Sequence, residues 1–267
     1  MAFTVHQTPE YLTSDLLGGT AHCFSTRRGG VSTGCLSSLN LGIHRGDAPE
    51  NVLENYRRLG QAVGFAPEDL VFTRQTHTAI VHRVGRQDRG CGLFRPVLPE
   101  RDGLITDEPG VALTVFSADC TPILFHDPAH HAIGAVHAGW RGTAQGIAAR
   151  CVQLLRDEFG TDPSRLRAAI GPCIGRCCFE TGPEVPEAMV NALGQEAACA
   201  ITDDHNGKFH VDLKQLNVLW LRRAGVKHID VCPDCTACQP ERFWSHRRVG
   251  GERGSLAAII MLRGEAL

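Results

Sequence analysis

Several features that would assign a chain to a particular class of protein are missing from this sequence. No apolar run approaches the ~20 residues that a membrane-spanning helix needs. Residues 1–9 contain no basic segment followed by an apolar stretch, which a secretory signal would show. The formal net charge is only -2, so no large field of one sign would attract nucleic acid or an anionic membrane. We therefore expect a cytoplasmic protein that binds neither.

Signatures of several well-known catalytic sites are also missing. No histidine has a glutamate two positions later, and Pro172-Cys173 is followed by a cysteine only at Cys177, so the nucleobase-deaminase pattern is absent. The spacing of a phosphate-binding P-loop does not occur. Multicopper chemistry would require paired His-x-His segments, and none is present. Redox copper is therefore disfavoured.

The residues that are present describe an ordinary globular protein. The chain has 267 residues, of which 43% are hydrophobic and 21% are charged, enough to bury a substantial core. We expect one domain over residues 1–267, or two tightly joined subdomains within it. Short apolar segments bounded by turns predict core strands, and apolar residues three and four positions apart predict helices. Strands outnumber helices without regular alternation, which indicates an α+β fold with mixed sheets flanked by helices.

The predicted elements can be placed by residue number. Strands are expected at residues 111–116, 123–126, 132–137, 167–170, 229–232 and 256–262, with further strands around the His77 turn within 70–84. Helices are expected over 51–62, over 142–159, from Pro183, and from Asp212 to a stop at Gly225.

Two unusual runs lie where predicted strands end. Cys120 lies in Ser117–Pro122, His137 begins the run His-Ala-Gly-Trp-Arg-Gly, and His77 lies in a third turn upstream. One thiolate and two imidazoles are the ligands of a catalytic zinc site, which keeps its fourth position open for water or substrate. Asp119, next to Cys120, is suited to orient a ligand. A lone histidine at a strand end is more often hydrogen-bonded than metal-bound, so the prediction rests on the combination.

The same residues support two other interpretations. Cys120 would be a nucleophile activated by His137, which would give a hydrolase or an amidase. Alternatively, the protein would be a zinc-stabilised interaction module without enzyme activity. We rank this last, because polar residues suited to a small-molecule pocket surround the proposed ligands.

The remaining cysteines form one conspicuous cluster. Cys232-x-x-Cys235-x-x-Cys238 resembles half of a structural zinc site or a reversible disulfide, but it lacks the second pair that a zinc ribbon has. Metal binding there is the less favoured interpretation. Free cysteine usually packs as a small buried hydrophobic residue. We expect this of Cys173, Cys177 and Cys178, although they could line the site, and of Cys23, Cys35, Cys91, Cys151 and Cys199.

Taken together, the motifs closely resemble the YfiH-type purine nucleoside phosphorylases, once described as multicopper polyphenol oxidase or laccase-domain proteins. The matching segments follow one another in order over nearly the whole chain. They are Thr26–Ser32, Ser38–Leu41, Gln75–His77, Asp102–Thr106, Ala118–Pro122, His137–Gly142, Ile170–Gly175, Cys235-Thr236 and Phe243–Arg248.

The resemblance implies an activity and a set of site residues. Zinc would be held by His77, Cys120 and His137, which would act in catalysis with Asp119, and copper is disfavoured. Purine nucleosides and phosphate would be the partners, bound by Arg27, Asn40, Gln75, Asp102 and Arg141. The expected reaction is phosphorolysis of adenosine, inosine and methylthioadenosine, with accompanying adenosine deaminase activity. The fold would be related to that of a bacterial toxin deamidase.

Two further points follow from the resemblance. Bacterial members have been linked to editing of peptidoglycan precursors, which would suit the alternative of a Cys120–His137 amide hydrolase. The family usually carries Thr-Gly-Arg before its last strand, whereas Gly254-Ser255-Leu256 stands there in this chain. Either Arg253 takes the place of the family's arginine or the register differs.

Overall fold

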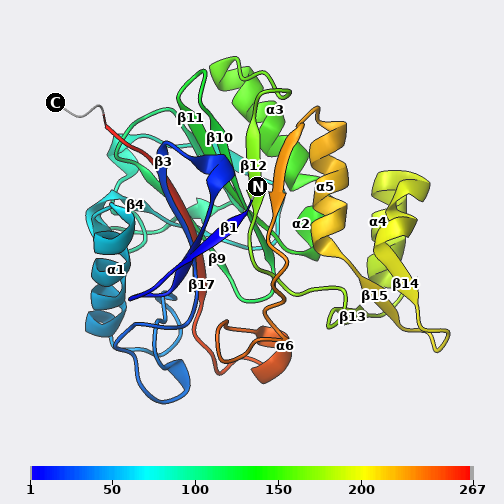
Figure 1. Cartoon of the computed structure of the whole chain (residues 1–267), viewed down its shortest axis with the longest axis horizontal. Coiled ribbons are helices and arrows are strands. Elements are labelled where there is room, and N and C mark those ends of the chain that lie inside the picture. The colour runs from blue at the N-terminus through cyan, green and yellow to red at the C-terminus, as the bar shows by residue number, and fades with distance from the viewer. Residues whose placement is uncertain (1, 265–267) are drawn as a thin grey trace.

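Two six-stranded sheets form the centre of the computed structural model, which describes residues 2–264 (Figure 1). The first sheet has the order β1-β2-β3-β17-β9-β4, and the second has the order β16-β12-β10-β11-β8-β6. The first is built from β1 (Phe3–His6), β2 (Tyr11–Ser14), β3 (Thr20–Ser25), β4 (Leu70–Val71), β9 (Ala112–Ser117) and β17 (Leu256–Leu262). The second is built from β6 (Val81–Arg83), β8 (Gly103–Thr106), β10 (Thr121–Asp127), β11 (Ala132–Ala138), β12 (Arg167–Ile170) and β16 (His228–Val231).

Helices cover the outer faces of the two sheets. In Figure 1, α1 lies beside the first sheet, and α3 and α5 lie beside the second. A smaller part is formed by α4 and a three-stranded sheet of order β13-β15-β14, while β5 and β7 pair separately. The remaining bounds are α1 (Pro49–Val63), α2 (Trp140–Ala144), α3 (Ile147–Phe159), α4 (Glu184–Leu193), α5 (Leu213–Arg223), α6 (His246–Val249), β5 (Thr73–Arg74), β7 (Leu98–Glu100), β13 (Glu180–Thr181), β14 (Ile201–Asp203) and β15 (Phe209–Val211).

The main core lies between the two sheets. Strand β17 alternates strictly: Leu256, Ala258, Ile260 and Leu262 face the second sheet, while its intervening residues pack beneath α1. In β11, Ile133 and Ala135 face the layer between the sheets, whereas Ala132 and Val136 pack against the helices on the other side. Since side chains alternate along a strand, His137 points into the layer between the sheets. This position places it among the ends of strands from both sheets.

The predicted α+β class with mixed sheets is confirmed. The strands predicted at 167–170 and 256–262 have these bounds in the structure, and Asp212 caps α5 by accepting from the Gln215 N–H at 3.0 Å. The single helix predicted over 142–159 is wrong, because the chain forms α2 and α3 with a break at Gln145-Gly146. Gly146 has a φ of 74°, a left-handed conformation that glycine readily adopts. None of the helices in residues 2–264 combines the length and apolar character that a bilayer crossing requires.

Two histidines are buried in the layer between the sheets, His22 on β3 and His126 on β10. Burial lowers the pKa of His22 to about 4, and burial with the nearby Arg167 charge lowers the pKa of His126 to about 4. Both values lie below the ordinary 6.5. As the pH falls, these histidines therefore take up protons first in the unfolded chain. The stability that depends on their neutral form is fully present above pH ~6.5 and is lost toward pH ~4.

We expect the free energy of unfolding in urea to fall by up to about 3 kcal/mol per histidine between pH 7 and pH 4. His126→Leu should flatten this fall, because it removes one of the two histidines whose pKa is lowered. Leucine breaks no hydrogen bond at Nδ1 of His126, since that atom has no partner in the described part of the chain. His205→Gln, at an exposed histidine, is the control. Parallel pH profiles for wild type and His126→Leu would contradict the assignment.

Candidate metal and substrate site

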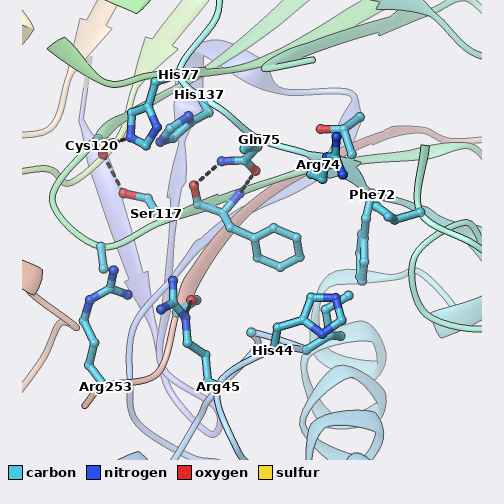
Figure 2. Close-up of a pocket in the computed structure, with 17 residues that line it drawn as sticks. His44, Arg45, Phe72, Arg74, Gln75, His77, Ser117, Cys120, His137 and Arg253 are labelled. Atoms are coloured by element: carbon cyan, nitrogen blue, oxygen red, sulfur yellow. Dashed lines mark hydrogen bonds between the residues drawn. The ribbon is translucent and has the colours of Figure 1, made fainter. Parts of the chain in front are cut away.

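His77, Cys120 and His137 meet where strands of both sheets end. His77 lies in the loop between β5 and β6, Cys120 in the turn between β9 and β10, and His137 near the end of β11. The pairing of Pro122 with His137 brings the Cys120 turn beside β11. The three potential ligand atoms lie within 4.8 Å of one another, and the Cys120 Sγ is 3.7 Å from the His77 Nε2 (Figure 2). One thiol and two imidazoles at this separation could hold a metal ion.

Asp102 fixes two of these three residues. Its Oδ1 accepts the Nδ1–H of His137 at 2.8 Å and the backbone N–H of His77 at 3.1 Å. Its Oδ2 accepts the backbone N–H and hydroxyl of Thr78 at 2.7 and 2.8 Å. His77 has a φ of 64°, and these bonds hold its loop in that uncommon conformation. A carboxylate bonded to one ring nitrogen leaves the other nitrogen of His137 for a metal.

Charge interactions in this group are strong. Burial opposes ionisation of Cys120, but the neighbouring His137 and His77 lower its pKa to about 6. Burial also opposes the charged form of His137, yet Cys120 and Asp102 raise its pKa to about 10. Burial would raise the pKa of Asp102, but its bonds to His137 and Thr78 lower it to about 2. Without a metal, Cys120, His137 and Asp102 form a chain of thiolate, imidazolium and carboxylate.

Gly139 closes one side of the group. A Cβ atom at this position would lie 2.5 Å from the His77 Cδ2 and 3.2 Å from the Cys120 Sγ. The backbone of the segment after β11 therefore packs directly against the two side chains, as only glycine allows.

A cavity of about 410 Å³ opens beside these residues, large enough for a small ligand. Figure 2 shows it extending from Cys120 and His137 to Phe72. The rings of Phe72 and Phe116 meet edge to face with centroids 4.9 Å apart. The other lining residues are Gly42, Ile43, His44, Arg45, Thr73, Arg74, Gln75, His77, Val97, Ser117, Ala118, Arg253 and Ser255.

Two arginines give the cavity a positive wall. The side chains of Arg45 and Arg253 are directed toward Ser117 and Cys120 (Figure 2). Arg253 is buried, and among residues 2–264 its Nε has no hydrogen-bond partner. Burial and the adjacent Arg45 charge lower the pKa of Arg253 to about 10. A buried guanidinium with an unused donor, beside a second cation, is a suitable site for an anion.

Of the substrate-binding residues predicted from the sequence, only Gln75 lines this cavity. Its amide is engaged by the backbone of Phe116, donating to the carbonyl at 2.9 Å and accepting the N–H at 2.6 Å. Asn40 is fully buried and accepts the N–H groups of Gly42 and Ser255. It thereby joins the two segments that carry Arg45 and Arg253.

The other predicted residues lie outside the cavity. Arg27 stacks over Trp244 and donates to the carbonyls of Ser37 and Pro240. Arg141 is exposed on α2 with its guanidinium over Trp140. Asp119 has a φ of 93°, and both of its carboxylate oxygens are occupied, by the Thr236 hydroxyl and the Arg247 N–H.

Sequence reasoning missed Arg45 as a residue of the cavity wall. It stands in Gly42-Ile43-His44-Arg45-Gly46, directly after the Ser38–Leu41 motif, and two glycines flanking a His-Arg pair could have marked it. The aromatic wall had no such signal, because Phe72 and Phe116 lie within apolar strand segments.

Comparison with known proteins identifies the family of the chain. Residues 21–263 match the family described as multi-copper polyphenol oxidoreductase laccase. The chain belongs to this family. It is 40% identical over 251 residues to the purine nucleoside phosphorylase YlmD of Geobacillus stearothermophilus, covering 92% of each chain. It is 37% identical to the purine nucleoside phosphorylase YfiH of Escherichia coli, over 91% of this chain and 94% of that protein.

Solved structures show the same fold. The crystal structure of YlmD from Geobacillus stearothermophilus matches with a TM-score of 0.91 at 39% identity, covering 95% of this chain and 96% of that one. The Bacillus licheniformis protein YfiH matches with a TM-score of 0.92 at 36% identity, covering 96% and 97%. The resemblance predicted from the motifs is confirmed.

Replacing Asp102 by asparagine should lower metal affinity and activity by about 10–100-fold, as expected when a residue that orients a ligand is changed. The amide would present a donor to N–H groups that now face two acceptor oxygens. Metal content and steady-state rates measure the effect. Asp107→Asn is the control, because Asp107 lies at the opposite end of β8 from Asp102 and pairs with Arg83 at the surface. Equal metal affinity in Asp102→Asn and wild type would show that Asp102 does not orient the ligands.

Proposed function

We propose that this protein is a zinc-dependent purine nucleoside phosphorylase. It would cleave adenosine, inosine and S-methyl-5'-thioadenosine with phosphate, giving the free base and ribose 1-phosphate or its methylthio form. The main support is a single cavity that joins a His-Cys-His group, a buried arginine with a free donor and an aromatic wall. The names of the relatives support the same reaction. The parts of the cavity come from segments between residues 42 and 255, so we propose one catalytic domain over 1–267.

Zinc suits the donor set of His77, Cys120 and His137. Imidazole and thiolate are its common ligands, and three protein ligands leave one position open. Copper is less favoured, because no histidine pair is spaced for a multicopper centre. When bound, zinc would supply a Lewis acid that polarises a substrate atom and stabilises developing negative charge.

The protein's own residues would then orient the two reactants. Arg45 and Arg253 would hold phosphate through charge-assisted hydrogen bonds. Phe116 would contact the purine, with the buried Phe72 supporting its ring from behind, and Gln75 would keep the Phe116 backbone in place. A phosphate oxygen would bond to the anomeric carbon as the glycosidic bond breaks, and the electron pair would leave with the base. The base would then take up a proton.

The other predicted residues receive positioning roles. Asp102 would orient His77 and His137, Asp119 would hold the Cys120 turn, and Asn40 would hold the segments of Arg45 and Arg253. Arg27 would tie the N-terminal loop to the segment before Phe243. Arg141 remains a sequence-based candidate for substrate binding. We propose a cytoplasmic enzyme whose partners are small molecules.

One observation favours a second function. Cys120, His137 and Asp102 form a chain with a low thiol pKa, which is the arrangement of a cysteine hydrolase. The alternative is therefore an amide hydrolase acting on a peptidoglycan precursor. It would require the metal-free form.

Incubating the purified protein with adenosine, with and without phosphate, tests the proposal. We expect adenine to appear only with phosphate, together with ribose 1-phosphate. Inosine would report the accompanying adenosine deaminase activity. Bound metal should be measured on the same sample, and zinc should equal or exceed one ion per chain. If neither adenine nor inosine forms with zinc-loaded protein, the phosphorylase assignment is wrong.

A further inference from the structure

Four cysteines outside the cavity lining come together at the carboxyl edge of the second sheet. Cys177 and Cys178 follow β12, and Cys235 and Cys238 follow β16. Strands β12 and β16 are parallel neighbours, so their following loops leave the sheet at the same edge. The four sulfur atoms all lie within 4.8 Å of one another.

We propose that these four cysteines bind a structural zinc ion, separate from the site at Cys120. Zinc–sulfur bonds of ~2.3 Å in a tetrahedron place the sulfurs ~3.8 Å apart. The Cys238 Sγ lies 3.5 Å from that of Cys177 and 3.4 Å from that of Cys178. All twelve cysteines of the chain are free, so no disulfide occupies these four sulfurs. An iron–sulfur cluster would need a wider cage, because its cysteines surround several metal ions.

The surroundings of the four sulfurs suit a tetrathiolate site. The backbone N–H of Gly175 donates to the Cys235 Sγ at 3.1 Å, a bond that stabilises a thiolate. A Cβ on Gly175 would lie 3.2 Å from the Cys177 Sγ, so glycine leaves room for the group. Four thiolates and one zinc ion carry a net charge of -2 in total, and Arg247 lies beside them, donating to the Cys178 carbonyl at 2.9 Å.

The composition of this group corrects the sequence-based interpretation. Cys232 belongs to the Cys-x-x-Cys-x-x-Cys run, but its side chain is buried and its sulfur lies 3.8 Å from Asp234. The second pair missing from the sequence pattern is supplied by Cys177 and Cys178, adjacent residues without the usual spacing of two. Folding brings them opposite Cys235 through the bridge between Cys173 and Cys235.

The site would also position the neighbouring catalytic turn. Thr236 lies between two of the cysteines, and its hydroxyl donates to Asp119 Oδ1 at 2.6 Å. Arg247, which holds the Cys178 carbonyl, donates its N–H to Asp119 Oδ2 at 2.6 Å. Asp119 directly precedes Cys120. An ion that fixes both loops would therefore fix the turn that carries Cys120.

Zinc binding can be tested on the wild-type protein by alkylating its thiols before and after treatment with a chelator. Cys177 and Cys238 are exposed, as are Cys35 and Cys199 outside the group. We expect Cys35 and Cys199 to react in both samples, and Cys177 and Cys238 to react at least about tenfold faster after zinc removal, because a metal-bound thiolate is not free to attack. Equal reactivity of all four before chelation would overturn the proposal, as would a disulfide at Cys238 found by mass spectrometry.

A second measurement separates this ion from the one at Cys120. In Cys120→Ala protein, X-ray absorption should show one zinc ion per chain with four sulfur ligands at ~2.3 Å. Adding Cys238→Ser should remove that zinc, whereas adding the control Cys199→Ser should retain it. Zinc-free Cys120→Ala protein would overturn the proposal. The proposed phosphorylase function can fail without affecting either result.

Discussion

Replacing Cys120 by serine should abolish the proposed phosphorolysis and remove the metal that we propose is held with His77 and His137. A hydroxyl is a poor replacement for a thiolate ligand, and Lewis-acid stabilisation worth several kcal/mol corresponds to a loss of at least about a thousandfold in kcat. Phosphate-dependent adenine release and metal content measured on the same sample check both effects. Cys35→Ser, at an exposed cysteine away from the site, is the control.

The nucleophile interpretation also predicts that Cys120→Ser is inactive, so the deciding sample is metal-free wild type. We expect it to be inactive in phosphorolysis and to recover when zinc is returned. Cleavage of an amide substrate by the metal-free protein, with a covalent adduct at Cys120, would support the hydrolase instead. Phosphorolysis that persists with no metal bound would show that the zinc assignment is wrong.

Replacing Arg253 by lysine should weaken phosphate use more than nucleoside binding. Lysine keeps the charge but loses the planar fork, and a buried charge left poorly paired costs about 2–4 kcal/mol. We expect kcat/KM for phosphate to fall roughly 100-fold, at an almost unchanged KM for adenosine. Initial rates at varied phosphate and fixed adenosine measure the change.

Two further variants show whether the loss of phosphate use is specific to Arg253. Arg248→Lys changes an exposed arginine near the same segment and should behave as wild type. Arg141→Lys tests the residue predicted from the sequence. If Arg141→Lys weakens phosphate use and Arg253→Lys does not, the anion binds elsewhere, and the assignment of Arg253 is wrong. Circular dichroism of each variant establishes that it folds.

Most of the fold could be predicted because its strands are short apolar runs ended by turns. Strand β17 is an example, since every residue of Leu256–Leu262 is buried and the apolar run has the bounds of the strand. Periodicity could not predict the break at Gly146. There the chain needs a left-handed residue, and the Trp220 ring lies only 3.3 Å from where a Cβ would be. Local spacing contains no information about that distant ring.

The sequence predicts those parts of the site whose chemistry follows from the type of residue alone. Histidine and cysteine at strand ends indicated the metal group, whereas Arg27 and Arg253 look equivalent in the sequence. Their difference arises from tertiary contacts: the Arg27 guanidinium is used by two carbonyls, while the Arg253 Nε meets no partner in the described residues. The pairing of Cys177 and Cys178 with Cys235 and Cys238 likewise depends on two strands being neighbours.

The central place of β17 in the first sheet determines when this sheet can be completed during synthesis. Strands β3 and β9 flank β17, so each has an unpaired edge until Leu256–Leu262 has left the ribosome. Before residues 253–262 are made, the nascent chain already contains His77, Cys120 and His137, but its cavity lacks Arg253 and Ser255. Open strand edges pair readily with other chains. A chain released before residues 253–262 are made would therefore lack part of its cavity and would be prone to aggregate.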